Sequence, residues 1–216
     1  MTMKKSVWDI LNWIVPVLLI TGQLLLLAPI SLNIWNGMHE RRELKKLVGF
    51  YQLAMTDPAA AADWAQTLED REESKVRLYS VALIWVKSDP SAAAAWAEAL
   101  QDETGKVVVL KSVAYGWVES DPSAAAAWAE ALQDETGKVE VLKSVAYGWV
   151  ESDPSAAAAW AEALQDETGK VEVLESVARN WVKSDPSAAA AWAEALQDEE
   201  TRAEVLSLLD RLNPGD

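Results

Sequence analysis

Residues 89–100 read DPSAAAAWAEAL, and the identical segment returns at 121–132, 153–164 and 185–196. A related segment, DPAAAADWAQTL, occupies residues 57–68. The Asp-Pro pair therefore recurs every 32 residues, and a tryptophan follows each proline by six positions. A second tryptophan series stands five residues before each later proline, at Trp85, Trp117, Trp149 and Trp181. A fixed period of this length is the signature of a tandem structural repeat.

Each repeat is predicted to contain two helices. In the unit that begins at Pro90, Asp89 suits the N-cap position, Pro90 suits the first helical position, and the alanine run favours helix. A period of 3.6 residues places Ala92, Ala93, Trp96 and Leu100 on the buried face of the first helix, with Ser91, Ala94, Glu98 and Gln101 opposite. The same period places Val107, Leu110, Val113, Ala114 and Trp117 on the buried face of the second helix.

Neither helix can bury its apolar face alone, so successive hairpins must stack into an α-solenoid. The fold class that we predict is all-α: a single transmembrane helix followed by a solenoid of about five helical hairpins. We assign residues 1–39 to a transmembrane anchor, 40–57 to a juxtamembrane capping helix, 58–199 to the tandem hairpins, and 200–216 to a C-terminal capping helix and tail.

The repeat resembles the tetratricopeptide repeat over about residues 57–199. The likeness rests on a helix-ending Asp-Pro, an alanine-rich first helix and a tryptophan six residues after the proline, as in Asp89, Pro90 and Trp96. The period is 32 residues rather than about 34. The Leu-Gly pair and the later aromatic of the family's first helix are missing, and Trp117 stands where the family prefers alanine. The resemblance implies an α-solenoid that binds a protein in a concave groove.

The N-terminal segment has the length and composition of a membrane anchor. No charged residue occurs from Ile10 to Met38, and a span of the bilayer core needs about 20 apolar residues. Trp8 and Trp13 stand near one end and Trp35 near the other, where aromatic residues mark membrane interfaces. The apolar run is too long for a cleaved signal peptide and lacks a clear cleavage site, so we expect it to be retained.

Three neighbouring residues in this span, Thr21, Gly22 and Gln23, are candidates for helix association within the membrane. An amide in lipid is costly unless it finds a hydrogen-bond partner, and small neighbours let a second helix approach. A single tolerated polar residue explains Gln23 equally well.

We expect a single-pass protein of a bacterial inner membrane. Four basic residues follow the span and two precede it, which favours a cytoplasmic over a periplasmic repeat domain under the positive-inside rule.

Composition narrows the function classes. The chain has no cysteine and one histidine, His39, so the commonest nucleophile–base pairs and metal ligands are missing. Residues 1–56 sum to +3, which leaves −18 for residues 57–216, and so acidic a body would repel nucleic acid. We predict no enzyme activity, cofactor, metal or small-molecule substrate, and a protein partner that is possibly an integral membrane complex.

Differences between the copies point to a partner surface. Most fall at positions 108, 111, 115 and 119 and at their equivalents 32 and 64 residues later, which form one stripe on the second helix. The stripe is apolar in the first unit and charged in the last. We predict that the partner contacts Val76, Tyr79, Leu83, Ile84, Lys111 and Tyr115. Packing of the first hairpin against the juxtamembrane helix, or free drift of outward positions, explains the same pattern.

Two functions of different class follow. The first is a membrane-tethered, non-catalytic scaffold whose solenoid binds a protein. The second is an accessory or assembly subunit of a larger membrane complex, held mainly through its transmembrane helix. A spacer whose length alone matters is a third, weaker hypothesis.

Overall fold

Every regular element in the described part of the chain is an α-helix, which confirms the predicted all-α class there. The computed structural model describes residues 38–212 except 102, 134 and 166. The chain divides into two compact units, Met1–Ser88 and Asp89–Asp216. The first unit holds α3 (Met38–Thr56), α4 (Pro58–Gln66) and α5 (Arg71–Ser88). The second holds α6 (Pro90–Ala99), α7 (Glu103–Val118), α8 (Pro122–Ala131), α9 (Glu135–Ser152), α10 (Pro154–Ala163), α11 (Glu167–Ser184), α12 (Pro186–Ala195) and α13 (Glu199–Leu212).

In the first unit, α3 packs against both helices of the hairpin formed by α4 and α5. Its Phe50 ring is buried, with its centroid 5.3 Å from that of Trp64 on α4. Arg77 of α5 lies over the same ring at 5.3 Å and donates to Glu73 Oε1 at 3.0 Å. Later repeats carry a buried valine at the position of Arg77. The predicted capping helix therefore closes this unit through an aromatic and cationic contact that the other repeats do not use.

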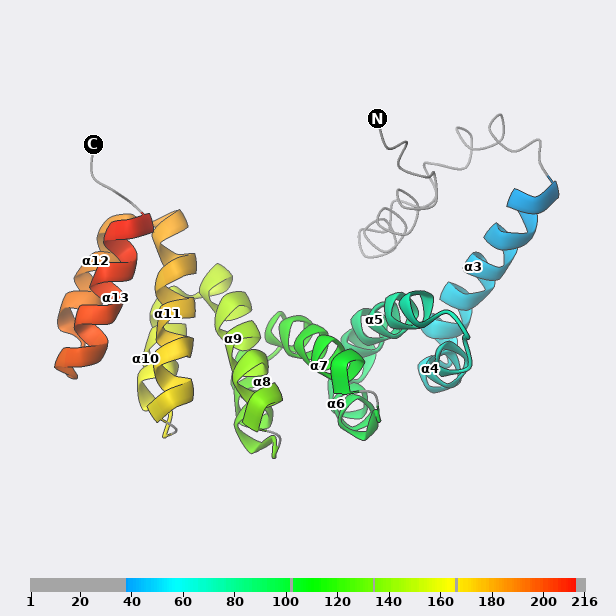
Figure 1. Cartoon of the computed structure of the whole chain (residues 1–216), viewed down its shortest axis with the longest axis horizontal. Coiled ribbons are helices and arrows are strands. Elements are labelled where there is room, and N and C mark those ends of the chain that lie inside the picture. The colour runs from blue at the N-terminus through cyan, green and yellow to red at the C-terminus, as the bar shows by residue number, and fades with distance from the viewer. Residues whose placement is uncertain (1–37, 102, 134, 166, 213–216) are drawn as a thin grey trace. The chain divides into compact units, whose positions relative to one another are not determined.

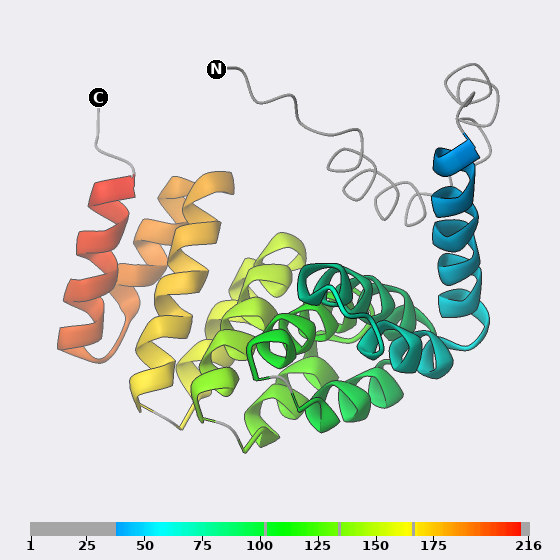
Figure 2. The same cartoon turned by 45° about the vertical axis from the view of Figure 1, so that its right-hand side comes forward.

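The second unit is a two-layered array of hairpins (Figures 1 and 2). The second helices of successive repeats pack directly on one another, α7 on α9, α9 on α11 and α11 on α13. The first helices lie between them, so that α8 contacts both α7 and α9 while α10 contacts both α9 and α11. Described Cα atoms of successive first helices stay more than 8 Å apart. This is the stacking of successive hairpins that the repeat predicted.

The helix starts follow the predicted capping scheme. In all five Asp-Pro pairs the aspartate Oδ1 accepts the backbone N–H of the third residue after it, at 2.9–3.0 Å. The proline that follows occupies the first helical turn, where its missing N–H leaves no bond unmade. The sequence therefore sets the start of every first helix without help from the rest of the fold.

Alanines bury a wider face of the first helix than the period alone predicted. In α6, Ala93, Ala94 and Ala97 are buried, with Ala94 only 3% exposed. The sequence-based prediction placed Ala94 on the face opposite the core, and that prediction was wrong. Ala126 of α8 and Ala158 of α10, at the same position, are also buried, and each of these two helices contacts two second helices rather than one.

The second helices largely agree with the prediction. Leu110, Val113 and Ala114 are buried, whereas Val107 and Trp117 are only half-buried. The prediction omitted Val109, which is 1% exposed.

The tryptophans join successive hairpins in pairs. Trp117 lies 5.7 Å from Trp128 of the next repeat between ring centroids, and the pairs Trp149–Trp160 and Trp181–Trp192 repeat this at 5.6 and 5.7 Å. The first-helix indoles of α8, α10 and α12 each donate their N–H at 2.8 Å to a glutamate 30 residues earlier, in the bonds Trp128–Glu98, Trp160–Glu130 and Trp192–Glu162. Most of these rings are half-buried, and Trp181 is buried. They therefore act as packing between layers, as predicted, although at the edge of the core rather than inside it.

Helix α13 differs from the other second helices as a terminal cap should. The position that is fully buried as Ala178 in α11 is the exposed Asp210 in α13. A charge at a stacking position opposes the addition of a further hairpin, because its burial would be costly.

We predict that Ala129→Leu destabilises the array, whereas Ala127→Leu in the same helix does not. Ala129 is fully buried and Ala127 is exposed. Overpacking should lower the free energy of unfolding by about 1–3 kcal/mol, against less than about 0.5 kcal/mol at the exposed position. Denaturation of the full chain in neutral detergent, followed by circular dichroism, measures both. Equal midpoints for the two variants would contradict the close packing of α8.

Candidate partner-binding face

Most positions that differ between copies lie together along α7, α9 and α11; we call these twelve positions the variable stripe. The stripe comprises Val108, Lys111 and Tyr115 on α7 with Glu119 just after its end, Glu140, Lys143, Tyr147 and Glu151 on α9, and Glu172, Glu175, Arg179 and Lys183 on α11. Because these three helices pack side by side, the stripe is continuous across the second unit.

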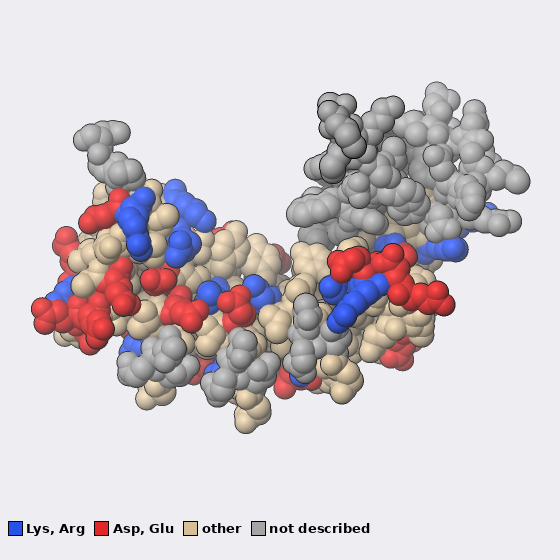
Figure 3. Space-filling view, in the orientation of Figure 1, with Lys and Arg blue, Asp and Glu red and all other residues tan. Residues whose placement is uncertain are grey.

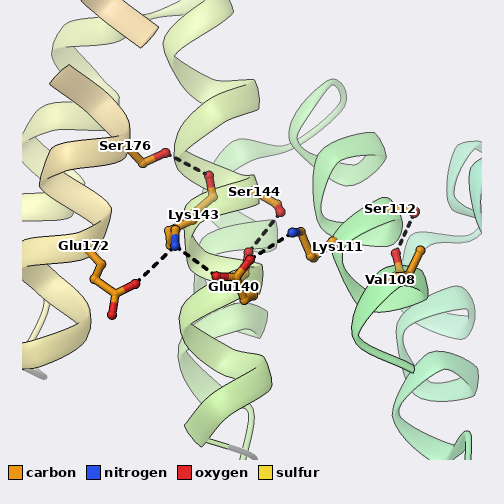
Figure 4. A network of polar contacts seen from close by, with 8 residues as sticks. All are labelled: Val108, Lys111, Ser112, Glu140, Lys143, Ser144, Glu172 and Ser176. Carbon is orange, nitrogen blue, oxygen red and sulfur yellow. Dashed lines mark hydrogen bonds and ion pairs between the residues drawn. The ribbon is translucent and has the colours of Figure 1, made fainter. Parts of the chain in front are cut away.

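A ladder of ion pairs crosses the stripe (Figure 4). Lys111 Nζ donates to Glu140 Oε2 at 2.9 Å, and Lys143 Nζ donates to Glu140 Oε1 at 2.9 Å. Lys143 Nζ also reaches Glu172 Oε2 on α11 at 3.1 Å. Charges of alternating sign thus connect three helices, and Figure 3 shows basic and acidic atoms alternating over this part of the surface. Lys111, one of the predicted partner contacts, is held by the next repeat.

The ladder shifts the titration of its members. Hydrogen bonds from Lys111 and Lys143 hold the pKa of the Glu140 carboxyl below its ordinary value. The bond to Glu140 raises the pKa of Lys143. These side chains are between one third and one half exposed, so each pair contributes less than about 1 kcal/mol to stability.

The sequence differences follow this ladder. Each lysine bonds a glutamate 29 residues later, as Lys111 does with Glu140 and Lys143 with Glu172. The third copy places Glu175 at the lysine position, and its carboxylate pairs with Arg179 in the same helix at 3.7 Å instead.

Tyrosines and glutamates gather at the C-terminal ends of α7 and α9. The rings of Tyr115 and Tyr147 lie 5.7 Å apart between centroids, and Tyr115 Oη donates to Glu151 Oε2 at 3.0 Å. Burial, followed by the bond to Glu151, raises the pKa of Tyr115 to about 12. The charge of Glu151 is also the main cause that raises the pKa of Tyr147. Tyr147 keeps 41% of its surface exposed.

Gly148 allows α9 to come this close to α7. A Cβ atom at this position would lie 3.2 Å from Val118 Cγ1 and 3.3 Å from Tyr115 Cδ2. Those distances are tighter than most Cβ contacts, so Val118 and Tyr115 would have to shift slightly to admit a larger residue.

The other predicted contacts lie in the first unit, on α5. Tyr79 is 40% exposed there, whereas Val76, Leu83 and Ile84 are half-buried. The predicted contacts are thus divided between the two units. Tyr79 is the most exposed of the four predicted contacts on α5.

The sequence prediction omitted Glu140, Tyr147 and Glu151, which complete the ladder and the tyrosine pair. A comparison of residues 29 and 36 positions apart would have found them, because those offsets separate Lys111 from Glu140 and Tyr115 from Glu151. The comparison of equivalent positions, 32 residues apart, reveals variation but not contact.

The residues predicted to contact the membrane lie outside the described residues. These are Trp8, Trp13, Trp35, Thr21, Gly22 and Gln23. Of the helices between residues 38 and 212, none combines the length and apolar character that crossing a bilayer requires. Within that same range, no group of three or more acidic or histidine side chains could hold a metal ion.

Comparison of the chain with protein-family models, curated proteins and solved structures finds no match. The function must therefore be argued from the stripe itself.

We predict that Glu140→Gln lowers the thermal midpoint at neutral pH and has no effect in acid. Because the folded-state pKa of Glu140 lies below its ordinary value, the carboxylate stabilises the fold above that ordinary value. The contribution is lost as the pH falls through the folded-state pKa. Thermal unfolding of the chain and the variant, from about pH 7 to about pH 3, measures the difference.

The matched control is Glu194→Gln, which removes the same charge from an exposed position of α12 outside the ladder. It should not reproduce the effect at neutral pH. A midpoint difference for Glu140→Gln that persists at the acidic end would show that the ladder is not its cause.

Proposed function

We propose that this protein is a membrane-tethered helical-repeat scaffold that binds a protein partner and performs no chemistry. The observation that carries the proposal is the concentration of sequence differences between α7, α9 and α11 in the variable stripe. The one difference outside it is Asn180, which replaces Gly116 and Gly148. Other packing residues of these helices repeat without change, and α6, α8, α10 and α12 are identical in sequence. Stacking explains the constant positions, whereas a surface that recognises something explains why most departures from the repeat gather on one face.

Exposed apolar side chains support a binding role for this face. Val108 is 46% exposed and Tyr147 is 41% exposed, both on the stripe of the second unit. In the first unit, Tyr79 is exposed on α5 at the position equivalent to Lys111 and Lys143, and the half-buried Leu83 is the equivalent of Tyr115 and Tyr147. Tyrosine is enriched at protein interfaces because it combines a large apolar ring with a hydroxyl group.

The resemblance to tetratricopeptide repeats supports the same proposal by analogy. Repeats of that kind bind proteins along a surface that several repeats share, and the stripe also extends over several repeats. The uncharged run from Ile10 to Met38 supports the tether.

The second candidate is an accessory subunit of a membrane complex, and Gln23 beside Gly22 favours it. In that case the membrane segment makes the decisive contacts, and the repeats serve as a cover or spacer. Replacing Thr21, Gly22 and Gln23 together by leucine in the full chain separates the two functions. Loss of partner association would favour the accessory subunit, and unchanged association would favour the scaffold.

The scaffold is tested by a photo-crosslinking residue placed at Tyr79 in the full chain, in its native membrane. We expect a specific protein adduct from this position and none from Ala127, which is exposed on the first helix α8. Tyr79→Glu combined with Leu83→Glu should abolish partner association, because two charges would enter an apolar contact.

Circular dichroism of the double variant shows whether a loss of partner association comes from the interface or from a destabilised fold. Unchanged helicity and thermal midpoint, together with loss of the partner, support the scaffold. A fall in the thermal midpoint would show that Tyr79 and Leu83 serve packing within the first unit instead.

A further inference from the structure

The tyrosines and glutamates of the stripe form a compact cluster at the C-terminal ends of α7 and α9. Its members are Tyr115, Tyr147, Glu119 and Glu151. The two rings are tilted by 36° with their centroids 5.7 Å apart, and Glu151 accepts the Tyr115 hydroxyl at 3.0 Å. Glu119, Tyr147 and Glu151 are exposed, so the outer side of the cluster is open to solvent.

The charged side chains of the cluster are all negative. The charges that raise the pKa of Tyr115 include those of Glu151 and Glu119, and both are negative. The two lysines of the stripe on α7 and α9, Lys111 and Lys143, are bonded to Glu140. The exposed ring of Tyr147 and the carboxylates of Glu119 and Glu151 thus lie beside the half-buried Tyr115, an arrangement that attracts a cation.

Stacking of the hairpins does not require the cluster. On α11 the equivalents of Tyr147 and Glu151 are Arg179 and Lys183, yet α11 packs on α9 through the same buried residues. Val177 and Ala178 of α11 are fully buried, as are Val145 and Ala146 of α9. The tyrosine and glutamate are therefore not required wherever one hairpin stacks on the next.

The net charge of the second unit also favours a cationic partner. Residues 89–216 carry 25 acidic and nine basic residues, whereas the stripe carries five acidic and four basic ones. Outside the stripe the unit is thus strongly acidic, and its field draws a basic segment toward the surface.

We propose that this cluster binds an arginine side chain from a basic segment of the protein partner, an inference that rests on the proposed scaffold function. A guanidinium group stacks on a tyrosine ring and donates in parallel to a carboxylate, which the geometry of Tyr147 beside Glu151 allows. Lysine fits less well because its ammonium group is compact and strongly hydrated.

The test uses the full chain in neutral detergent and a fluorescent octa-arginine peptide, with binding followed by fluorescence anisotropy. Tyr147→Leu and Glu151→Gln should each weaken binding about fivefold, as the loss of one cation–π contact or one exposed charge pair predicts. Tyr147→Phe keeps the ring and should bind within about twofold of the unaltered chain. Octa-lysine should bind more weakly than octa-arginine.

Glu194→Gln is the charge-matched control, since it removes one exposed carboxylate from α12, away from the cluster. It should change binding by less than about twofold. An equal loss for Glu194→Gln and Glu151→Gln, no loss for Tyr147→Leu, or no binding of octa-arginine would overturn the proposal. Because Glu151→Gln and Tyr147→Phe are nearly isosteric, they keep the test valid even if Tyr147→Leu disturbs the fold.

The photo-crosslinked adduct at Tyr79 separates this proposal from the scaffold itself. An adduct that octa-arginine does not compete away would leave the scaffold in place and refute the arginine site. The absence of any adduct would refute the scaffold.

Discussion

Close approach of helices through alanine is the constraint on which the second unit depends. Fully buried alanines recur at the same positions of each first helix, as Ala93, Ala125, Ala157 and Ala189 do. Such small side chains let a first helix settle between two second helices, while the tryptophan pairs fill the wider space at the edge. A larger residue at any of these positions would part the layers, so all copies must keep them.

The same constraint explains where variation is possible. The fully buried positions of α7, α9 and α11 are held constant, and most of the variation lies on the less buried stripe. Part of the stripe has a structural use, because the ladder through Lys111, Glu140 and Lys143 ties three helices together. The tyrosine cluster also links α7 to α9 through Tyr115 and Glu151, but α11 stacks on α9 without it, and this is why we propose it as a surface that meets a partner.

Charge is also distributed unevenly over the second unit. Most acidic residues of the second unit lie outside the stripe, while on it acids and bases nearly balance. A basic partner would be attracted to the unit as a whole and would find aromatic rings and apolar contacts on the stripe. Charge of this kind guides association and choice of partner, whereas the exposed aromatic side chains supply contact area.

Sequence alone determined the repeat, the two helices per unit, their capped starts and the stacking of hairpins. These features depend on local chemistry that each copy carries in full: an aspartate beside its own helix start, a proline in the first turn and an apolar period. It also located the variable stripe, because near-identical copies can be compared with one another.

Only the tertiary structure decided what the side chains of the stripe do. It showed that Lys111 and Tyr115 contact the following repeat, that Glu140, Tyr147 and Glu151 belong with them, and that Ala94 is buried. Helical periodicity reports the face of one helix, but contacts between neighbours depend on how far successive helices are offset and on whether one neighbour or two cover that face. Those quantities arise from packing, which a pattern within a single helix does not contain.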